Sequence, residues 1–227
     1  MGLLDIFRKR KKEVDSVDPF REIDFVKGNY KAFFDLLLNK SLIILITGKR
    51  GSGKTALGFT LLELMGSCKE KCYVVGFDKA KLPSWAKKTK KLEDVPNNST
   101  ALVDEGAILY SSRDSLNKSN KMLGSLMSIA RHKNLNLILI SQNSAMIDLN
   151  VLRLADVLLL KEPSLLQSEF ERPAIKKMYQ KIKPFFIKQD DNRSKYFYVW
   201  SDEFEGLLGF NLPSFWNESI SKSFKNI

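Results

Sequence analysis

One stretch of the sequence combines glycines, a lysine and a hydroxyl residue at a spacing suited to holding a polyanion. Residues 48–55 read Gly-Lys-Arg-Gly-Ser-Gly-Lys-Thr and fit the pattern G-x-x-x-x-G-K-[ST]. Glycines let the backbone turn successive N–H groups toward an anion, and a helix that follows adds the positive end of its dipole. Lys54 would place its charge on the β- and γ-phosphates, and the Thr55 hydroxyl would ligate Mg²⁺. The predicted ATP-binding residues are Gly48, Lys49, Arg50, Gly51, Ser52, Gly53, Lys54 and Thr55.

The residues on either side of this loop decide between a functional motif and a chance match in a Gly- and Lys-rich turn. Residues 41–47 form a short apolar, β-branched run that is typical of a buried parallel strand. Residues 56–65 carry leucines on one side and predict a helix with an apolar face. Strand, glycine loop and helix together are the context that phosphate binding requires.

A second run of residues predicts acidic groups beside the same ligand. Residues 100–105 read Thr-Ala-Leu-Val-Asp-Glu, a buried strand that ends in two carboxylates. In an open α/β sheet, ligands bind at the carboxyl edge of the strands. Asp104 would hold Mg²⁺, through water, and Glu105 would polarise an attacking water as general base. The alternative is a strand that simply ends in a polar turn.

Further elements complete an α/β pattern. Residues 135–141 predict another buried strand, and the Gln142 amide that follows it would hydrogen-bond the γ-phosphate or the lytic water, or would only cap a loop. Further strands are expected at 72–75, 157–160 and 196–200, and helices at 115–133 and 151–155. Helical pieces are expected over 20–38 and, interrupted at Pro173, over 167–182; residues 78–98 read as irregular.

Composition limits the partners and the compartment. The chain has 227 residues, 37 of them basic and 26 acidic, for a net charge of +11. This balance favours a polyanionic partner, either nucleic acid or an anionic membrane surface. No apolar run approaches the ~18 residues of a membrane-spanning helix, so we expect a cytoplasmic protein without membrane insertion. Cys68 and Cys72 are expected to be reduced thiols, because the single histidine leaves a zinc site short of ligands.

The predicted domain organisation is simple. Residues 1–19 form a basic arm, with the run 8–12 entirely Lys and Arg, and residues 20–227 form one domain with an aromatic C-terminal extension from about residue 190. The arm reads as a solvated terminus or as an electrostatic tether to DNA or a membrane.

The order of these motifs resembles the FtsK/HerA class of P-loop ATPases. Within that class, the chain is most similar to the genome-packaging ATPases of archaeal viruses and to the ATPase core of the zonula occludens toxin-like proteins. The segments that carry the resemblance are 48–55, 102–105, 130–133 and 138–142, with weaker support from 153–156 and 202–206. The resemblance implies an α/β, RecA-like P-loop NTPase fold, with an additional strand, a catalytic Glu and a mostly parallel sheet between helices.

The resemblance also implies an activity. It implies a hexameric, ATP- and Mg²⁺-dependent motor that moves double-stranded DNA, here for packaging a viral genome, with Gln142 as γ-phosphate sensor. Capsid or virion proteins would be partners, in the host cytoplasm or in the virion. Such rings take an arginine finger from the neighbouring subunit. The candidates are Arg113, Arg131, Arg153 and Arg172, among which sequence spacing does not choose; we take Arg131 as the working candidate.

Two other functions stay open. One is a plasmid-borne conjugation or replication ATPase of the same class. The other is a nucleotide-dependent assembly factor that does not move DNA. Glu105 distinguishes the assembly factor from the motors, because a protein that only switches on nucleotide binding needs no water-activating base. The phage-assembly relatives carry a membrane-spanning segment and the larger translocases carry DNA-guiding domains, neither of which is expected here.

Overall fold

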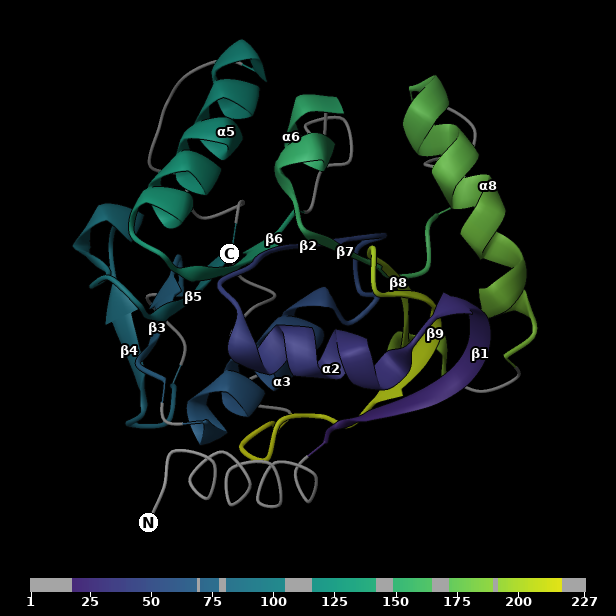
Figure 1. Cartoon of the computed structure of the whole chain (residues 1–227), viewed down its shortest axis with the longest axis horizontal. Coiled ribbons are helices and arrows are strands. Elements are labelled where there is room, and N and C mark those ends of the chain that lie inside the picture. The colour runs from purple at the N-terminus through teal and green to yellow at the C-terminus, as the bar shows by residue number, and fades with distance from the viewer. Residues whose placement is uncertain are drawn as a thin grey trace.

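The fold is built on one large sheet covered by helices on both faces (Figure 1). This computed structural model describes residues 18–68, 70–77, 81–104, 116–141, 149–164, 172–189 and 192–217. Over these residues, nine strands follow the order β1-β9-β8-β7-β2-β6-β5-β3-β4 across the sheet.

Six neighbouring strands are parallel and form the larger part of the sheet. They are β2 (Ile43–Thr47), β3 (Cys72–Val75), β4 (Ala86–Thr89), β5 (Thr100–Asp104), β6 (Asn136–Ile140) and β7 (Val157–Leu160). The other three continue the sheet in antiparallel pairing beyond β7. They are β8 (Tyr196–Trp200), β9 (Phe204–Phe210) and β1 (Phe20–Gly28).

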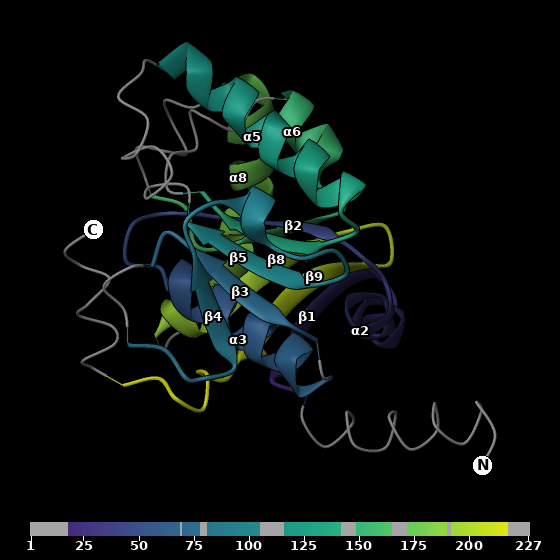
Figure 2. The same ribbon diagram turned by 90° about the vertical axis from the view of Figure 1, so that its left-hand side faces the viewer.

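The helices bury both faces of the sheet, and this explains the unbroken apolar runs in its central strands (Figures 1 and 2). One face is covered by α2 (Tyr30–Asn39) and α3 (Lys54–Ser67). The other is covered by α5 (Leu116–His132), α6 (Leu149–Leu154) and α8 (Pro173–Ile187). Two short 3₁₀ turns, η1 (Leu92–Asp94) and η3 (Arg193–Lys195), complete the elements. None of the described helices combines the length and apolar character needed to cross a bilayer.

The predicted α/β architecture is confirmed, with a mostly parallel sheet between helices. The strands expected within 41–47, 72–75, 100–105, 135–141, 157–160 and 196–200 are all present, as are the helices over 56–65, 115–133 and 151–155. The central strands are buried on both faces and read as continuous apolar runs, whereas a helix such as α5 is buried on one face and shows the helical period. Both patterns can be read directly from the sequence.

The prediction of helical pieces over 20–38 is wrong for its first half, which forms β1. The register of β1 against β9 shifts between Glu22 and Asp24 and again between Phe25 and Lys27. Each bulge interrupts the alternation of inward and outward side chains, so the sequence loses the two-residue period of a strand. The second half is α2, which Asn29 caps by accepting a hydrogen bond from the Ala32 N–H.

Two other strands and one helix start also differ from expectation. Residues 86–89, within a segment expected to be irregular, form the edge strand β4. Pro173 begins α8, which runs to Ile187, and its missing N–H costs nothing there. The first part of the helix expected over 167–182, residues 167–171, lies outside the described residues. The strand β9 was not expected, because its Glu and two glycines resemble a turn. All seven of its residues are buried.

Gly206 in β9 should be intolerant of a side chain. A Cβ there would lie 2.4 Å from the Asp24 carbonyl oxygen and 2.8 Å from the Phe204 ring. We expect Gly206→Ala to lower the free energy of unfolding by about 1–3 kcal/mol, measured by urea denaturation followed by circular dichroism. Gly209→Ala is the matched control, since its Cβ would meet nothing closer than 3.6 Å. Equal stability of the two variants would contradict the close β1–β9 approach.

Candidate nucleotide-binding site

The glycine loop follows β2 at the carboxyl edge of the sheet and leads directly into α3. Gly48, Gly51 and Gly53 have φ values of 143°, 75° and 88°, a region that side-chain-bearing residues rarely adopt. Gly53 is the N-cap of α3, and no side chain caps this helix. The first N–H groups of α3 are therefore left to a ligand, as in an anion-binding helix start.

Lys54 lies across the loop. Its side chain is 7% exposed, and its Nζ donates to the carbonyl oxygens of Gly48 and Lys49 at 2.9 and 3.0 Å. Burial lowers the pKa of Lys54 to about 8, and the nearby Asp104 carboxylate partly opposes this shift. Lys54 and Asp104, predicted from separate motifs, thus act on each other electrostatically.

Asp104 and Thr55 offer the oxygen atoms that Mg²⁺ prefers. Asp104 ends β5, pairs with Ile140 of β6 and is 5% exposed. Thr55 lies in the first turn of α3 and is partly exposed. No cluster of three or more His, Cys, Asp or Glu side chains occurs in the described part of the chain. These two residues therefore fit a Mg²⁺ ion whose remaining ligands are phosphate oxygens and water.

Ser52 gives an independent sign that the loop fits a phosphate. Its Oγ is buried and has no hydrogen-bond partner among the described residues. An unpaired buried hydroxyl is costly, and a phosphate oxygen would accept its proton.

A cavity of about 780 Å³ adjoins the loop. Gly51, Gly53 and Ala56 line it from the side of the loop and α3. Ser194, Tyr196 and Trp216 line it from η3, β8 and the C-terminal segment. The volume lies within the range of small-ligand sites, and the mixture of polar and aromatic groups suits a nucleoside.

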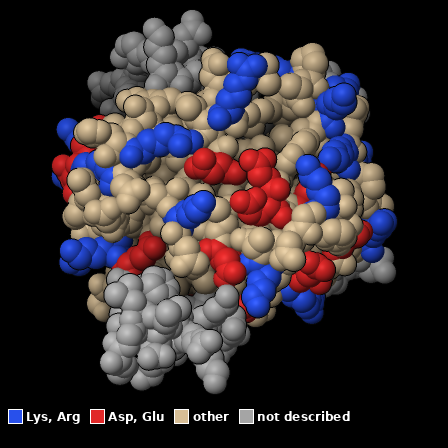
Figure 3. All heavy atoms as spheres, viewed as in Figure 1, with Lys and Arg blue, Asp and Glu red and all other residues tan. Residues whose placement is uncertain are grey.

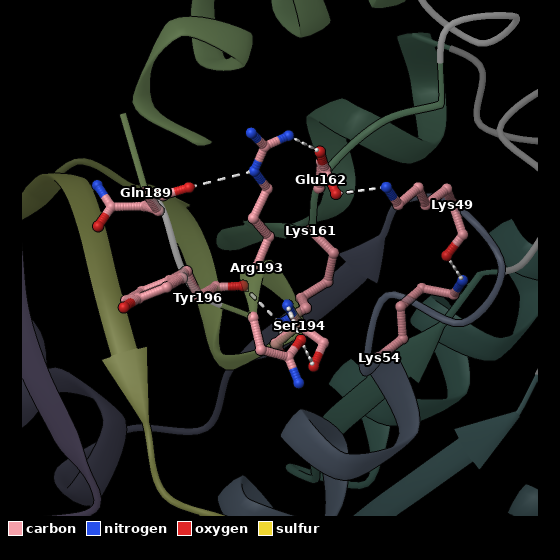
Figure 4. A network of polar contacts seen from close by, with 9 residues as sticks. Lys49, Lys54, Lys161, Glu162, Gln189, Arg193, Ser194 and Tyr196 are labelled. Carbon is pink, nitrogen blue, oxygen red and sulfur yellow. Dashed lines mark hydrogen bonds and ion pairs between the residues drawn. The ribbon is translucent and has the colours of Figure 1, made fainter. Parts of the chain in front are cut away.

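The wall of this cavity is joined to the loop by charged residues that sequence reasoning missed (Figure 4). Lys161 follows β7, and its Nζ donates to the Ser194 carbonyl oxygen at 2.7 Å and to that of Tyr196. Glu162 accepts from Lys49 of the loop and from Arg193 of η3. The sequence did offer one signal for Lys161 and Glu162: they are a charged pair directly after an apolar strand, and Asp104 likewise lies at the end of a strand.

Both residues have shifted pKa values. Burial lowers the pKa of Lys161 well below its ordinary value, and the positive charge of Lys54 lowers it further. Burial raises the pKa of Glu162, but the hydrogen bonds from Lys49 and Arg193 outweigh this, and its pKa falls below the ordinary value.

The remaining predicted site residues do not join this geometry. Glu105, Gln142 and Arg113 lie outside the described residues. Arg131 lies at the opposite edge of the sheet, where its guanidinium donates to the Leu154 carbonyl and pairs with Asp156 at 3.2 Å.

The strand β2 separates Arg131 from the loop. Asp156 also accepts the N–H of Ile43, the first residue of β2, whereas the loop follows Thr47, about 13 Å further along. Arg131 is therefore not part of its own chain's phosphate site, and a finger role requires contact across a subunit interface.

Solved structures of P-loop ATPases share this fold. The genome-packaging NTPase B204 from Sulfolobus turreted icosahedral virus 2, in complex with AMPPCP, is 13% identical, with a TM-score of 0.50 over 77% of this chain and 100% of its own. The pCW3 conjugation coupling protein TcpA, in monomer form with ATPγS, is 11% identical, with a TM-score of 0.52 over 95% of this chain and 72% of its own. No protein-family profile and no curated protein matches the sequence significantly.

At these identities the likeness shows the fold alone, and that fold is the RecA-like P-loop NTPase fold that the resemblance implied.

Ligand binding should weaken at alkaline pH because of Lys54. Its pKa is about 8 in the empty loop, and a bound phosphate raises it, since an anion favours the ammonium. Binding then takes up a proton above about pH 8, so the Kd for ATP should rise by up to about tenfold per pH unit between about pH 8 and 9.5. Isothermal titration calorimetry at several pH values measures this.

Lys54→Arg is the control, because arginine keeps its charge over this range. We expect the Kd of Lys54→Arg for ATP to stay constant between about pH 8 and 9.5. A pH-independent Kd in the wild type would show that Lys54 does not titrate in the empty loop.

Proposed function

We propose that this protein is an ATPase that translocates double-stranded DNA and packages a viral genome into a capsid. The observation that carries the proposal is the loop itself: three glycines at positive φ, Lys54 across them, and Asp104 at the end of β5, which β6 separates from β2. This arrangement is built for the phosphates of a nucleotide, and the adjoining cavity would hold the nucleoside.

Each group has a role in hydrolysis. The loop N–H groups and Lys54 would bind the phosphates, and Thr55 with Asp104 would hold Mg²⁺, which would supply positive charge to offset the negative charge of the phosphates. Glu105 follows Asp104 directly and takes the proton of the attacking water. Gln142 follows the neighbouring strand β6 by two residues and senses the γ-phosphate.

DNA is the proposed polyanionic partner, and the net charge of +11 supports it. On the face seen in Figure 3, basic side chains are interspersed with a central group of acidic ones. The proposal therefore rests on overall charge rather than on a basic patch of that face. In a hexameric ring, Arg131 or another arginine would complete the site of the neighbouring subunit, and capsid proteins would be further partners.

Two alternative functions would use the same site. TcpA, a conjugation coupling protein, aligns over 95% of this chain, which supports a plasmid-transfer ATPase. A nucleotide-dependent assembly factor would use the same loop and cavity but would hydrolyse ATP slowly and without regard to DNA.

Duplex DNA should stimulate ATP turnover. A motor couples hydrolysis to its track, and the stimulation should decline with salt because phosphate contacts release counterions. The measurement is steady-state phosphate release with and without duplex DNA over a series of salt concentrations. Turnover that ignores DNA at every salt concentration would exclude the motor and favour the assembly factor.

Glu105→Gln should abolish hydrolysis while preserving ATP binding. Removing the base and keeping the shape is expected to lower kcat by about 10²- to 10⁴-fold. Single-turnover hydrolysis and calorimetric ATP binding measure the two effects. Glu93→Gln, which alters an exposed carboxylate of η1, is the matched control and should behave as the wild type. Unchanged hydrolysis in Glu105→Gln would remove this residue from the mechanism.

A further inference from the structure

The adjacent residues Lys161 and Glu162 connect the phosphate loop to the opposite wall of the cavity. We propose that they form a latch that fixes η3 and the start of β8 against the loop and thereby sets the affinity for the nucleoside part of the ligand. The inference rests on the proposed function of the site as an ATP-binding site, and neither residue touches the ligand: both are positioning residues.

Lys161 holds the wall through its backbone. Its side chain is fully buried, and its Nζ donates to the carbonyl oxygens of Ser194, at 2.7 Å, and Tyr196. The ammonium also lies 4.6 Å from the centre of the Phe210 ring. A buried cation without such partners would be strongly unfavourable, so these contacts offset part of its desolvation and hold the 194–196 backbone.

Two glycines of the loop allow this contact to be direct. A Cβ on Gly48 would lie 2.6 Å from the Lys161 Cβ, and a Cβ on Gly53 would lie 2.8 Å from the Ser194 carbonyl oxygen. The loop and the wall therefore touch without an intervening side chain. Displacement of the wall changes the width of the cavity at the point where the phosphates would meet the nucleoside.

Glu162 makes the second half of the latch. Its carboxylate joins Lys49 of the loop to Arg193 of η3, with the Arg193 contact at 2.9 Å. Arg193 also donates to the Gln189 carbonyl oxygen at 3.4 Å, just beyond the end of α8. The wall is thus held at two points, one buried and one near the surface (Figure 4).

The two sides of the cavity would bind different parts of a nucleotide. The phosphates bind to the loop and α3, which belong to one side of the cavity. The nucleoside also needs the other side, to which Ser194, Tyr196 and Trp216 belong. Inorganic tripolyphosphate tests the loop alone, whereas ATP tests the loop and the wall together. The ratio of their dissociation constants therefore reports the position of the wall.

The experiment compares ATP with inorganic tripolyphosphate by isothermal titration calorimetry, both with Mg²⁺, on the full chain. Lys161→Met removes the ammonium and keeps the stem, and Glu162→Gln removes the bridging charge. Lys40→Met and Glu93→Gln, at exposed positions outside the cavity, are the matched controls. We expect the preference for ATP over tripolyphosphate to fall about tenfold in Lys161→Met, and less in Glu162→Gln, as expected for lost hydrogen bonds to charged groups.

The outcomes are distinguishable. An unchanged ratio in folded variants, or an equal loss of both ligands, overturns the latch. If Lys161→Met does not fold, as judged by circular dichroism, Glu162→Gln decides alone, because its change lies nearer the surface. A wild type that binds neither ligand overturns the proposed function, and the latch with it.

Discussion

Two buried ammonium groups beside one glycine loop are the constraint on which the rest of the site depends. Lys54 is 7% exposed and Lys161 is not exposed at all. Burial lowers the pKa of both, and the charge of Lys54 lowers that of Lys161 further. Backbone carbonyl oxygens accept from both groups, and the Asp104 and Glu162 carboxylates partly oppose the shifts. A bound polyanion would stabilise both charges further. The loop is therefore built for a polyanion.

The order of the strands explains how these groups meet. β2 lies between β7 and β6, and β5 follows next, all parallel, so their carboxyl ends share one edge. Lys161 leaves β7 on one side of the loop, and Asp104 ends β5 on the other. β8 is antiparallel to β7 and begins at that same edge, which brings η3 back onto the loop. A parallel β8 would start at the far edge and leave the cavity without this wall.

The features of the site that depend on local patterns could be predicted from the sequence. The loop, the central strands and Asp104 were predictable because burial on both faces and the glycine motif leave direct traces in neighbouring residues. The β1–β9 pair was not, because bulges remove its period and Gly206 is required by a close approach to a strand 182 positions earlier in the chain, at Asp24. The contact between Lys161 and Ser194 joins residues 33 positions apart, for which one sequence contains no signal.

The aromatic C-terminal segment also acquires a role that composition alone did not suggest. Phe215 and Trp216 pack against Phe59 of α3, with ring centres 5.7 and 6.2 Å apart. Thr60 of the same helix donates to the Asn211 carbonyl oxygen at 2.9 Å. The C-terminal segment thus packs on α3, the helix that begins at the loop, and Trp216 of this segment lines the cavity. A ligand that contacts loop and cavity would stabilise both together, since binding to the folded arrangement alone shifts the equilibrium toward it. Nucleotide binding would therefore also favour the packing of this segment against α3.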